Sequence, residues 1–173
     1  LRPQVIRELD LAKHGLQMAP SVGTYTPHWD GYLDRRTDHA DTLREIRKWS
    51  HKDADNYDDF KQTVTDITRF IRPAIDIPAP DPYGDPHEWL DYAGLAKDFG
   101  HLPLRTKGAL LDLITGSAYD FLRRWFEGEP LIGTMSASGI IGTFLGIKSP
   151  GTGMVALRMV QASTFSLMRD TTT

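Results

Sequence analysis

The sequence has no cysteine among its 173 residues. Disulfides, thiolate catalysis and cysteine-ligated zinc or iron–sulfur sites are therefore excluded for this chain. Long apolar runs are also lacking: the longest weakly polar stretch, 131–147, is short and interrupted by glycine and serine, so it does not predict a transmembrane helix. Charged residues break up the N-terminus at Arg2, Arg7 and Glu8, which argues against a secretory signal.

The chain has no large excess of positive or negative charge. Twenty lysines and arginines stand against 23 aspartates and glutamates, and both signs are mixed along the chain. A nucleic-acid-binding protein would show a basic patch or stripe, so no nucleic-acid partner is expected. The length suffices for one domain with a hydrophobic core. Because the chain begins at Leu1 within a pattern that is already amphipathic, we expect it to be an excerpt of a longer protein.

The first part of the chain, 1–36, predicts a small antiparallel β element. Asp30-Gly31 is a hairpin signal between the candidate strands 24–29 and 32–35. Pro27 has no backbone N–H, so it would confine its strand to a sheet edge. From residue 38 the apolar period becomes helical, and Ser50 followed by Asp53 resembles a capping box. The helix that follows carries an apolar stripe from Tyr57 to Ile71 and is predicted to stop at Pro73.

Four prolines and a glycine make 76–86 a loop or linker and the strongest candidate break in the chain. Further helices are predicted at 87–99, 104–115, 117–127, 130–140 and 154–163, with Ser117 and Asp120 repeating the capping pattern. The predicted fold class is therefore α+β and helix-rich. We expect a single partial domain: a β-containing segment at 1–36, a helical segment at 38–160 and an atypical polar tail at 161–173.

No motif of a self-contained active site is visible. The six histidines are scattered without metal-ligand spacing, and neither a GxSxG elbow nor a phosphate-binding glycine loop occurs, so no metal site is expected and the catalytic residues stay unassigned. The acidic run of Asp53, Asp55, Asp58 and Asp59 favours a solvated helical face over a calcium loop. We expect Arg123 and Arg124 to have a structural role. They would lie either on a charged helix face or in an ion pair with Glu127 or Glu129.

The stretch 121–153 is the most informative part of the sequence. Bulky Trp125 and Phe126 precede a run of small and apolar residues and a Gly-Ser-Pro-Gly-Thr-Gly loop. Aromatic side chains bury large areas, and small residues let a backbone or a flat ligand come close, so the pattern predicts one wall of a cavity for a large apolar ligand. Gly139, Gly142 and Gly146 favour close helix packing or a kink over ligand contact.

Several blocks of the sequence come in the order found in one known family. They are LRPQVIRELDLAKHGL (1–16), Tyr25-Thr26-Pro27, KWSHKDADNYDDF (48–60), FLRRWFEGEPLIGTMSASGIIGTF (121–144) and KSPGTGMVALRMV (148–160). Together they resemble the phytoene desaturase-like flavoprotein oxidoreductases, and WFEGEPL and SPGTG are the most specific parts. The resemblance extends to about Val160, and the family's dinucleotide fingerprint is not within the chain.

The resemblance implies the substrate-domain portion of an amine-oxidase-like, FAD-dependent oxidoreductase that acts on an apolar, polyene-like substrate. The FAD would be held by the remaining FAD domain of the longer protein, in the cytoplasm of a prokaryote or the mitochondrion of a eukaryote. It implies that these residues lie near the substrate tunnel or the flavin edge: Trp125, Phe126, Gly142, Thr143, Phe144, Pro150, Gly151 and Thr152. Open interfaces could also lead to self-association or peripheral membrane contact. The alternative is a non-catalytic helical module that binds a protein partner or a lipid-like ligand.

Overall fold

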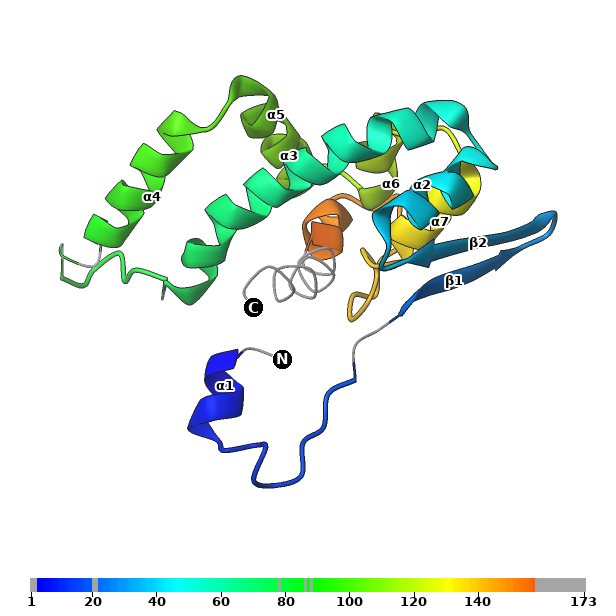
Figure 1. The fold of residues 1–173 in the computed structure, drawn as a ribbon. Helices are drawn as coiled ribbons and strands as arrows, with labels where there is room; N and C mark the ends of the chain where they lie inside the picture. Colours follow the sequence, from blue (N-terminus) through cyan, green and yellow to red (C-terminus); the bar gives the residue numbers. More distant parts are fainter. Residues whose placement is uncertain (1–2, 20–21, 78, 86, 88, 158–173) are drawn as a thin grey trace.

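The computed structural model describes residues 3–19, 22–77, 79–85, 87 and 89–157 (Figure 1). In chain order the elements are α1 (Pro3–Glu8), β1 (Gly23–His28), β2 (Gly31–Arg36), α2 (His39–Arg47), α3 (His51–Asp76), α4 (Trp89–His101), α5 (Leu104–Thr115), α6 (Ala118–Arg123) and α7 (Glu129–Ala137). Residues 152–157 are also helical. The described part is thus helix-rich with one small antiparallel sheet, which confirms the α+β prediction.

The hairpin forms where the sequence predicts it, with its turn shifted by one residue. His28 pairs with Gly31, so the turn is Trp29-Asp30 and not Asp30-Gly31. Gly31 opens β2 with a φ of 148°, which a side chain would make unfavourable. Pro27 lies on β1, whose one partner among the described strands is β2, in line with its predicted place on an edge strand.

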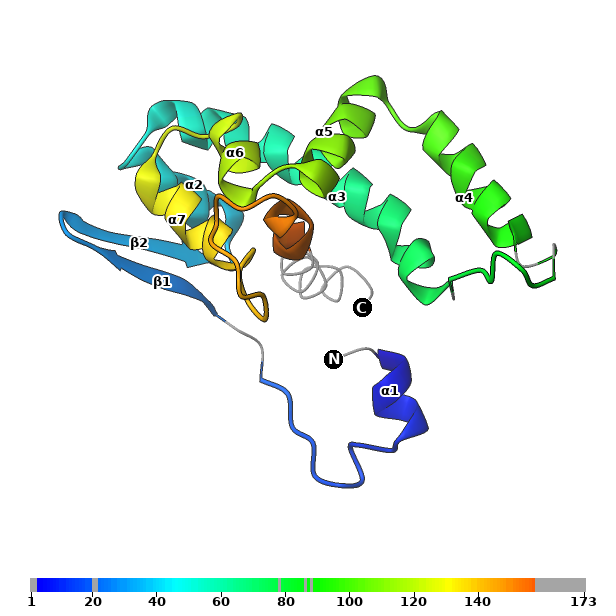
Figure 2. The ribbon, with the colours of Figure 1, turned by 180° about the vertical axis from the view of Figure 1, so that it is seen from behind.

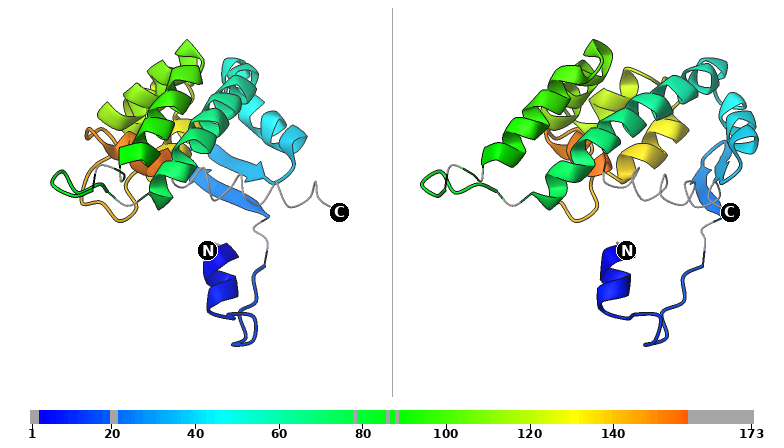
Figure 3. Two further views of the ribbon diagram at one scale, coloured as in Figure 1. Left: turned by 90° about the vertical axis from the view of Figure 1, so that its left-hand side faces the viewer. Right: turned by 60° about the vertical axis from the view of Figure 1, so that its left-hand side comes forward.

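The hairpin is fixed to the helices through β2. The Trp49 indole N–H donates to the Tyr32 carbonyl oxygen at 3.2 Å, and the Thr42 hydroxyl donates to the Arg36 carbonyl oxygen at 2.8 Å. Leu33 points from β2 into the core and is fully buried. Figures 1, 2 and 3 show the hairpin beside α2 and α7, whereas α1 stands apart from the other elements.

The longest helix, α3, runs for 26 residues and is capped as predicted. The Asp53 backbone N–H donates to the Ser50 hydroxyl at 3.1 Å. The predicted stop at Pro73 is wrong, because α3 continues to Asp76 with the proline inside it. Pro73 lies in the last turn of α3, and three more helical residues follow it. The missing N–H and the bend of a proline disturb few hydrogen bonds so close to a helix end, so the helix can continue to Asp76.

The remaining helices follow the predicted pattern with different ends. The bounds of α5 match the prediction of 104–115, whereas α4 and α7 begin and end within a few residues of theirs. The predicted helix 117–127 is shorter, since α6 ends at Arg123 and the chain then turns. The predicted helix 154–163 begins at 152, and its part beyond 157 lies outside the described residues.

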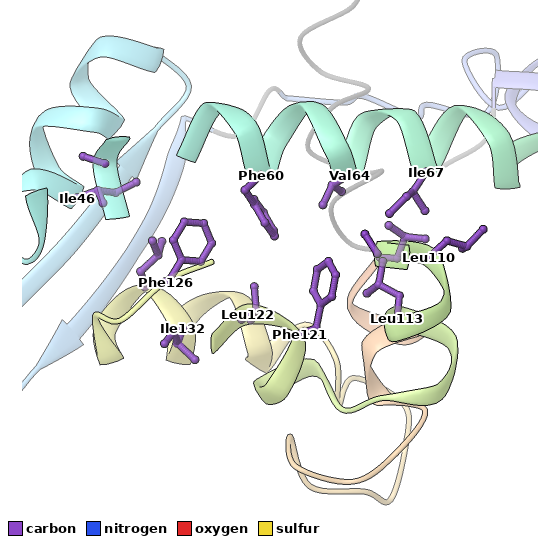
Figure 4. Close-up of a cluster of buried hydrophobic side chains, with 14 of the residues drawn as sticks. Ile46, Phe60, Val64, Ile67, Leu110, Leu113, Phe121, Leu122, Phe126 and Ile132 are labelled. Carbon is purple, nitrogen blue, oxygen red and sulfur yellow. The ribbon is translucent and has the colours of Figure 1, made fainter. Parts of the chain in front are cut away.

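The core lies between α3 and the elements that pack beneath it (Figure 4). Phe60, Val64 and Ile67 project from one face of α3, toward side chains of α5 and α6 and of the segments that follow α6. The larger buried side chains on that second side include Leu110, Leu113, Phe121, Leu122, Phe126, Leu131 and Ile132. Stretch 121–132 therefore supplies much of the core opposite α3.

Candidate functional site

The turn after α6 places two neighbouring aromatic residues in different surroundings. Phe126 is 2% exposed, with its ring centroid 4.9 Å from that of Phe60. Trp125 is half-buried, at 5.6 Å from Phe60, and the Arg105 guanidinium lies 4.8 Å from the centre of its ring. Phe126 thus belongs to the core, whereas Trp125 has one side on the core and another at the surface.

A buried carboxylate holds this turn in place. Asp53, at the start of α3, is 1% exposed. Its two oxygens accept the backbone N–H groups of Glu127 and Gly128, each at 2.8 Å. A Cβ at Gly128 would come within 2.8 Å of the Asp53 carboxylate, so glycine permits this approach. The prediction that the acidic run forms a solvated face is therefore wrong for Asp53: its position in the first turn of α3 lets it bind the backbone of the WFEGEP block.

The charged side chains around the turn form structural contacts. The Ser50 hydroxyl donates to Glu127 at 3.1 Å, and the Lys52 ammonium lies 3.2 Å from the same carboxylate. Arg123 donates to the Glu127 carbonyl oxygen at 3.0 Å and lies 3.6 Å from Glu129, which confirms the predicted ion pair of Arg123 with Glu129. Arg124 pairs instead with Asp112 of α5.

The Glu127 contacts make a small part of the stability dependent on pH. Hydrogen bonds from Lys52 and Ser50 hold the pKa of Glu127 below its ordinary value of 4.5. A carboxyl whose pKa is lower in the folded state stabilises the fold above its unfolded pKa, and this contribution is lost as the pH falls through the folded pKa. In the wild type, this loss should lower the urea concentration at the unfolding midpoint as the pH falls below about 5. We expect that decrease to be smaller in Glu127→Gln. An unchanged pH profile would show that the exposed contacts contribute nothing.

The SPGTG loop is attached to the start of α6 through its backbone and one hydroxyl. Thr152 is fully buried; its hydroxyl accepts the Ala118 backbone N–H at 3.0 Å and donates to the Ser149 carbonyl oxygen at 2.7 Å. The Gly151 backbone N–H donates to the Gly116 carbonyl oxygen at 2.9 Å. These donors bind within the chain, so the loop does not present them to a cofactor phosphate.

Removing the Thr152 hydroxyl should leave the Ala118 N–H without a partner inside the protein. We expect Thr152→Val, which keeps the shape of the side chain, to lower the free energy of unfolding by about 1–3 kcal/mol. Thr143→Val is the matched control, because the Thr143 hydroxyl bonds the Ile140 carbonyl oxygen within an exposed loop. Urea denaturation of both variants measures the difference; equal losses would contradict this role for Thr152.

Glycines in the stretch 139–153 have different roles. A Cβ at Gly139 would lie 2.8 Å from the Ala118 Cβ, and one at Gly153 would lie 2.7 Å from the Leu113 carbonyl oxygen. The packing interpretation thus holds for Gly139. It is wrong for Gly142 and Gly146, where an added Cβ would meet no atom within 4 Å. Gly142 adopts a φ of 76°, which glycine allows more readily than other residues, so its role is to permit the turn.

Loop 140–145 exposes apolar side chains. Phe144 is fully exposed, and Ile141 and Leu145 are about half exposed. No charged residue occurs between Glu129 and Lys148. The residues predicted to lie near a substrate or flavin thus fall into three environments: Trp125 and Phe126 at the core, Gly142 to Phe144 in an exposed loop, and Pro150 to Thr152 beside the start of α6.

The spaces next to these residues differ in size. Phe121, Leu122 and Leu157 help to line a pocket of about 20 Å³, room for about one water molecule. A groove of about 420 Å³ lies beside Trp125 and is open to the surface. Neither of these two spaces is an enclosed cavity for a large apolar ligand. Among the described residues no cluster of three or more metal-binding side chains occurs, and no helix is long and apolar enough to cross a membrane.

The sequence is similar to part of a longer protein. Pyridine nucleotide-disulfide oxidoreductase domain-containing protein 2 from Mus musculus is 31% identical over 180 residues, and the protein of that name from Rattus norvegicus is 29% identical over 184. No family model matches the chain. No solved structure matches it either. Each alignment covers 94% of the chain and 31% of the relative, so the chain is similar, over nearly its whole length, to less than a third of a protein named as an oxidoreductase.

Proposed function

We propose that the chain is the substrate-domain portion of a FAD-dependent, phytoene desaturase-like oxidoreductase with an amine-oxidase-like fold. The observation that carries the proposal is the alignment of 94% of the chain with both oxidoreductase relatives. WFEGEPL and SPGTG, the specific blocks of the resemblance, both have defined places next to the core. In this proposal the remaining part of the longer protein holds the FAD.

The exposed apolar loop 140–145 supports an apolar, polyene-like substrate. Burying Phe144 and Ile141 against such a substrate, or against the FAD domain, would remove apolar surface from water. The loop would then form one wall of the substrate site, exclude water and orient the substrate. FAD, when bound by the longer protein, would supply the hydride acceptor.

The longer protein provides the direct test. We expect it to purify with the visible absorption of an oxidised flavin and to lose that absorption when an apolar polyene substrate is added without oxygen. Phe144→Ser should lower kcat/KM for that substrate by about tenfold or more, because a large apolar contact is replaced by a polar group. A longer protein that stays colourless after reconstitution with FAD would exclude the proposal.

The alternative is a non-catalytic helical module that binds a protein partner or a lipid-like ligand. It is favoured by the inward use of the Thr152 hydroxyl and the Gly151 N–H, which are not available to a cofactor. The same flavin measurement separates the two functions. Binding of an apolar ligand by a protein that cannot be loaded with flavin would support the module.

A further inference from the structure

Helix α5 buries one side in the core and exposes an apolar stripe on the other. Leu110 and Leu113 are buried, and Figure 4 shows both on the side of α5 that faces α3. Residues at steps of four and three share one side of a helix. On the opposite side of α5 such a series is exposed, and we call it the α5 stripe: Leu104, Gly108, Leu111 and Thr115.

The α5 stripe has the shape of a helix-packing surface. Leu104 is 86% exposed and Leu111 is 54% exposed, with Ile114, at 48%, on one edge of the stripe. A Cβ added at Gly108 would meet no atom within 4 Å, so a gap lies between the two leucines. The Thr115 hydroxyl donates to the Leu111 carbonyl oxygen at 2.8 Å and is satisfied within the helix. The stripe therefore offers apolar ridges and a gap, which is what a second helix packs against.

The α5 stripe is complementary to itself. The knob of one helix packs into a hole formed by four residues of the next, at positions such as 104, 107, 108 and 111. When a second α5 lies antiparallel to the first, with a two-fold axis close to Ala109, Leu111 of each copy enters the gap at Gly108 of the other. The same arrangement places Leu104 of one copy beside Ile114 of the other. One surface then supplies both halves of a symmetric contact.

The charges beside the stripe favour the antiparallel arrangement. Arg105 and Asp112 lie on one edge of the stripe, about two helical turns apart, with side chains 59% and 32% exposed. Each is already in an ion pair within the chain. Antiparallel helices bring Arg105 of one copy close to Asp112 of the other, whereas parallel helices would bring like charges together. On the other edge, Lys107 donates to the Gly100 carbonyl oxygen at 2.8 Å, which holds its charge beside α4.

We propose that two copies of the chain associate through the α5 stripe, antiparallel to each other, about a two-fold axis near Ala109. The contact buries the exposed leucines of both copies and opposes charges of opposite sign. It involves neither a flavin nor loop 140–145. The proposal therefore goes beyond the function proposed above and does not depend on it.

Sedimentation velocity of the chain over a range of concentrations is the first test. We expect the wild type to change from monomer to dimer as the concentration rises. Leu111→Glu should raise the dimer dissociation constant about tenfold or more, because a charge would replace the apolar group at the centre of the contact. Leu90→Glu is the matched control: Leu90 is 64% exposed but belongs to α4, so this variant should associate as the wild type does.

Single cysteines test the geometry, since the chain has none of its own. Gly108→Cys places its thiol near the two-fold axis and should form a disulfide-linked dimer on oxidation, because a disulfide requires Cα atoms within about 7 Å of each other. Leu104→Cys should not, since the antiparallel arrangement puts its two thiols at opposite ends of the contact. Equal cross-linking of both variants would overturn the antiparallel arrangement.

Three further outcomes would overturn the proposal. They are a wild type that stays monomeric at every concentration, a Leu111→Glu variant that associates as the wild type does, and a loss of association in Phe144→Ser. The first would leave the α5 stripe to another segment of the longer protein, and the last would move the interface to loop 140–145. Circular dichroism confirms that each variant is folded.

Discussion

Phe126→Ala is expected to lower the free energy of unfolding by about 3–5 kcal/mol. The Phe126 ring is 2% exposed and packs edge-on against Phe60, and its ring centroid lies 6.3 Å from that of Tyr57. Truncation would remove this buried apolar area and leave a cavity at the junction of α3 with the turn after α6. Urea denaturation, with the slope compared between variants, measures the loss.

Phe144→Ala is the control for this prediction. The chemical change is the same, but Phe144 is fully exposed, so its stability should stay within about 0.5 kcal/mol of the wild type. The sequence predicts one shared site for the two residues, and the structure gives them opposite environments. Similar losses for both variants would show that Phe144 is buried in solution.

Asp53→Asn is expected to cost about 2–3 kcal/mol of stability although it barely changes the side-chain volume. The carboxylate accepts two backbone N–H groups, from Glu127 and Gly128. An asparagine offers one oxygen and one NH₂ group, so one of the two backbone donors would face another donor. The Gly128 position leaves little room for relaxation, since a Cβ there would already contact the carboxylate.

Asp55→Asn is the matched control on the same turn of α3. The Asp55 side chain is 70% exposed and pairs with Arg47 at 3.1 Å. Exposed ion pairs contribute about 0–1 kcal/mol, so this variant should unfold close to the wild type. If Asp53→Asn and Asp55→Asn behaved alike, the carboxylate of Asp53 would not hold the turn.

The sequence is most informative where local signals act alone. The spacing of Ser50 and Ser117 to Asp53 and Asp120 predicts helix caps, and both hydroxyls accept the expected N–H groups. The bounds of α5 follow from a helical period ended by Gly116. Such features depend on neighbouring residues and are therefore readable from a single chain.

The misses at the candidate site depend on contacts between distant residues. Asp53 looks like its exposed neighbours in the acidic run, and its burial follows from the approach of Gly128, which lies 75 positions away. The position of Asp53 in the first turn of a helix is the available signal, but its partner cannot be named from spacing. The groove at Trp125 is missed for the same reason, because Arg105 and Gly108 come from a separate helix.

The Asp53 contacts have a consequence for how the chain can be divided. They join positions on either side of the proline-rich segment 79–85, which belongs to the strongest candidate break. Until Gly128 has been synthesised, the carboxylate lacks its two donors and the start of α3 lacks its partner. A protease that cuts within 79–85 should therefore yield two fragments that stay associated under native conditions, because each completes the hydrogen bonds of the other.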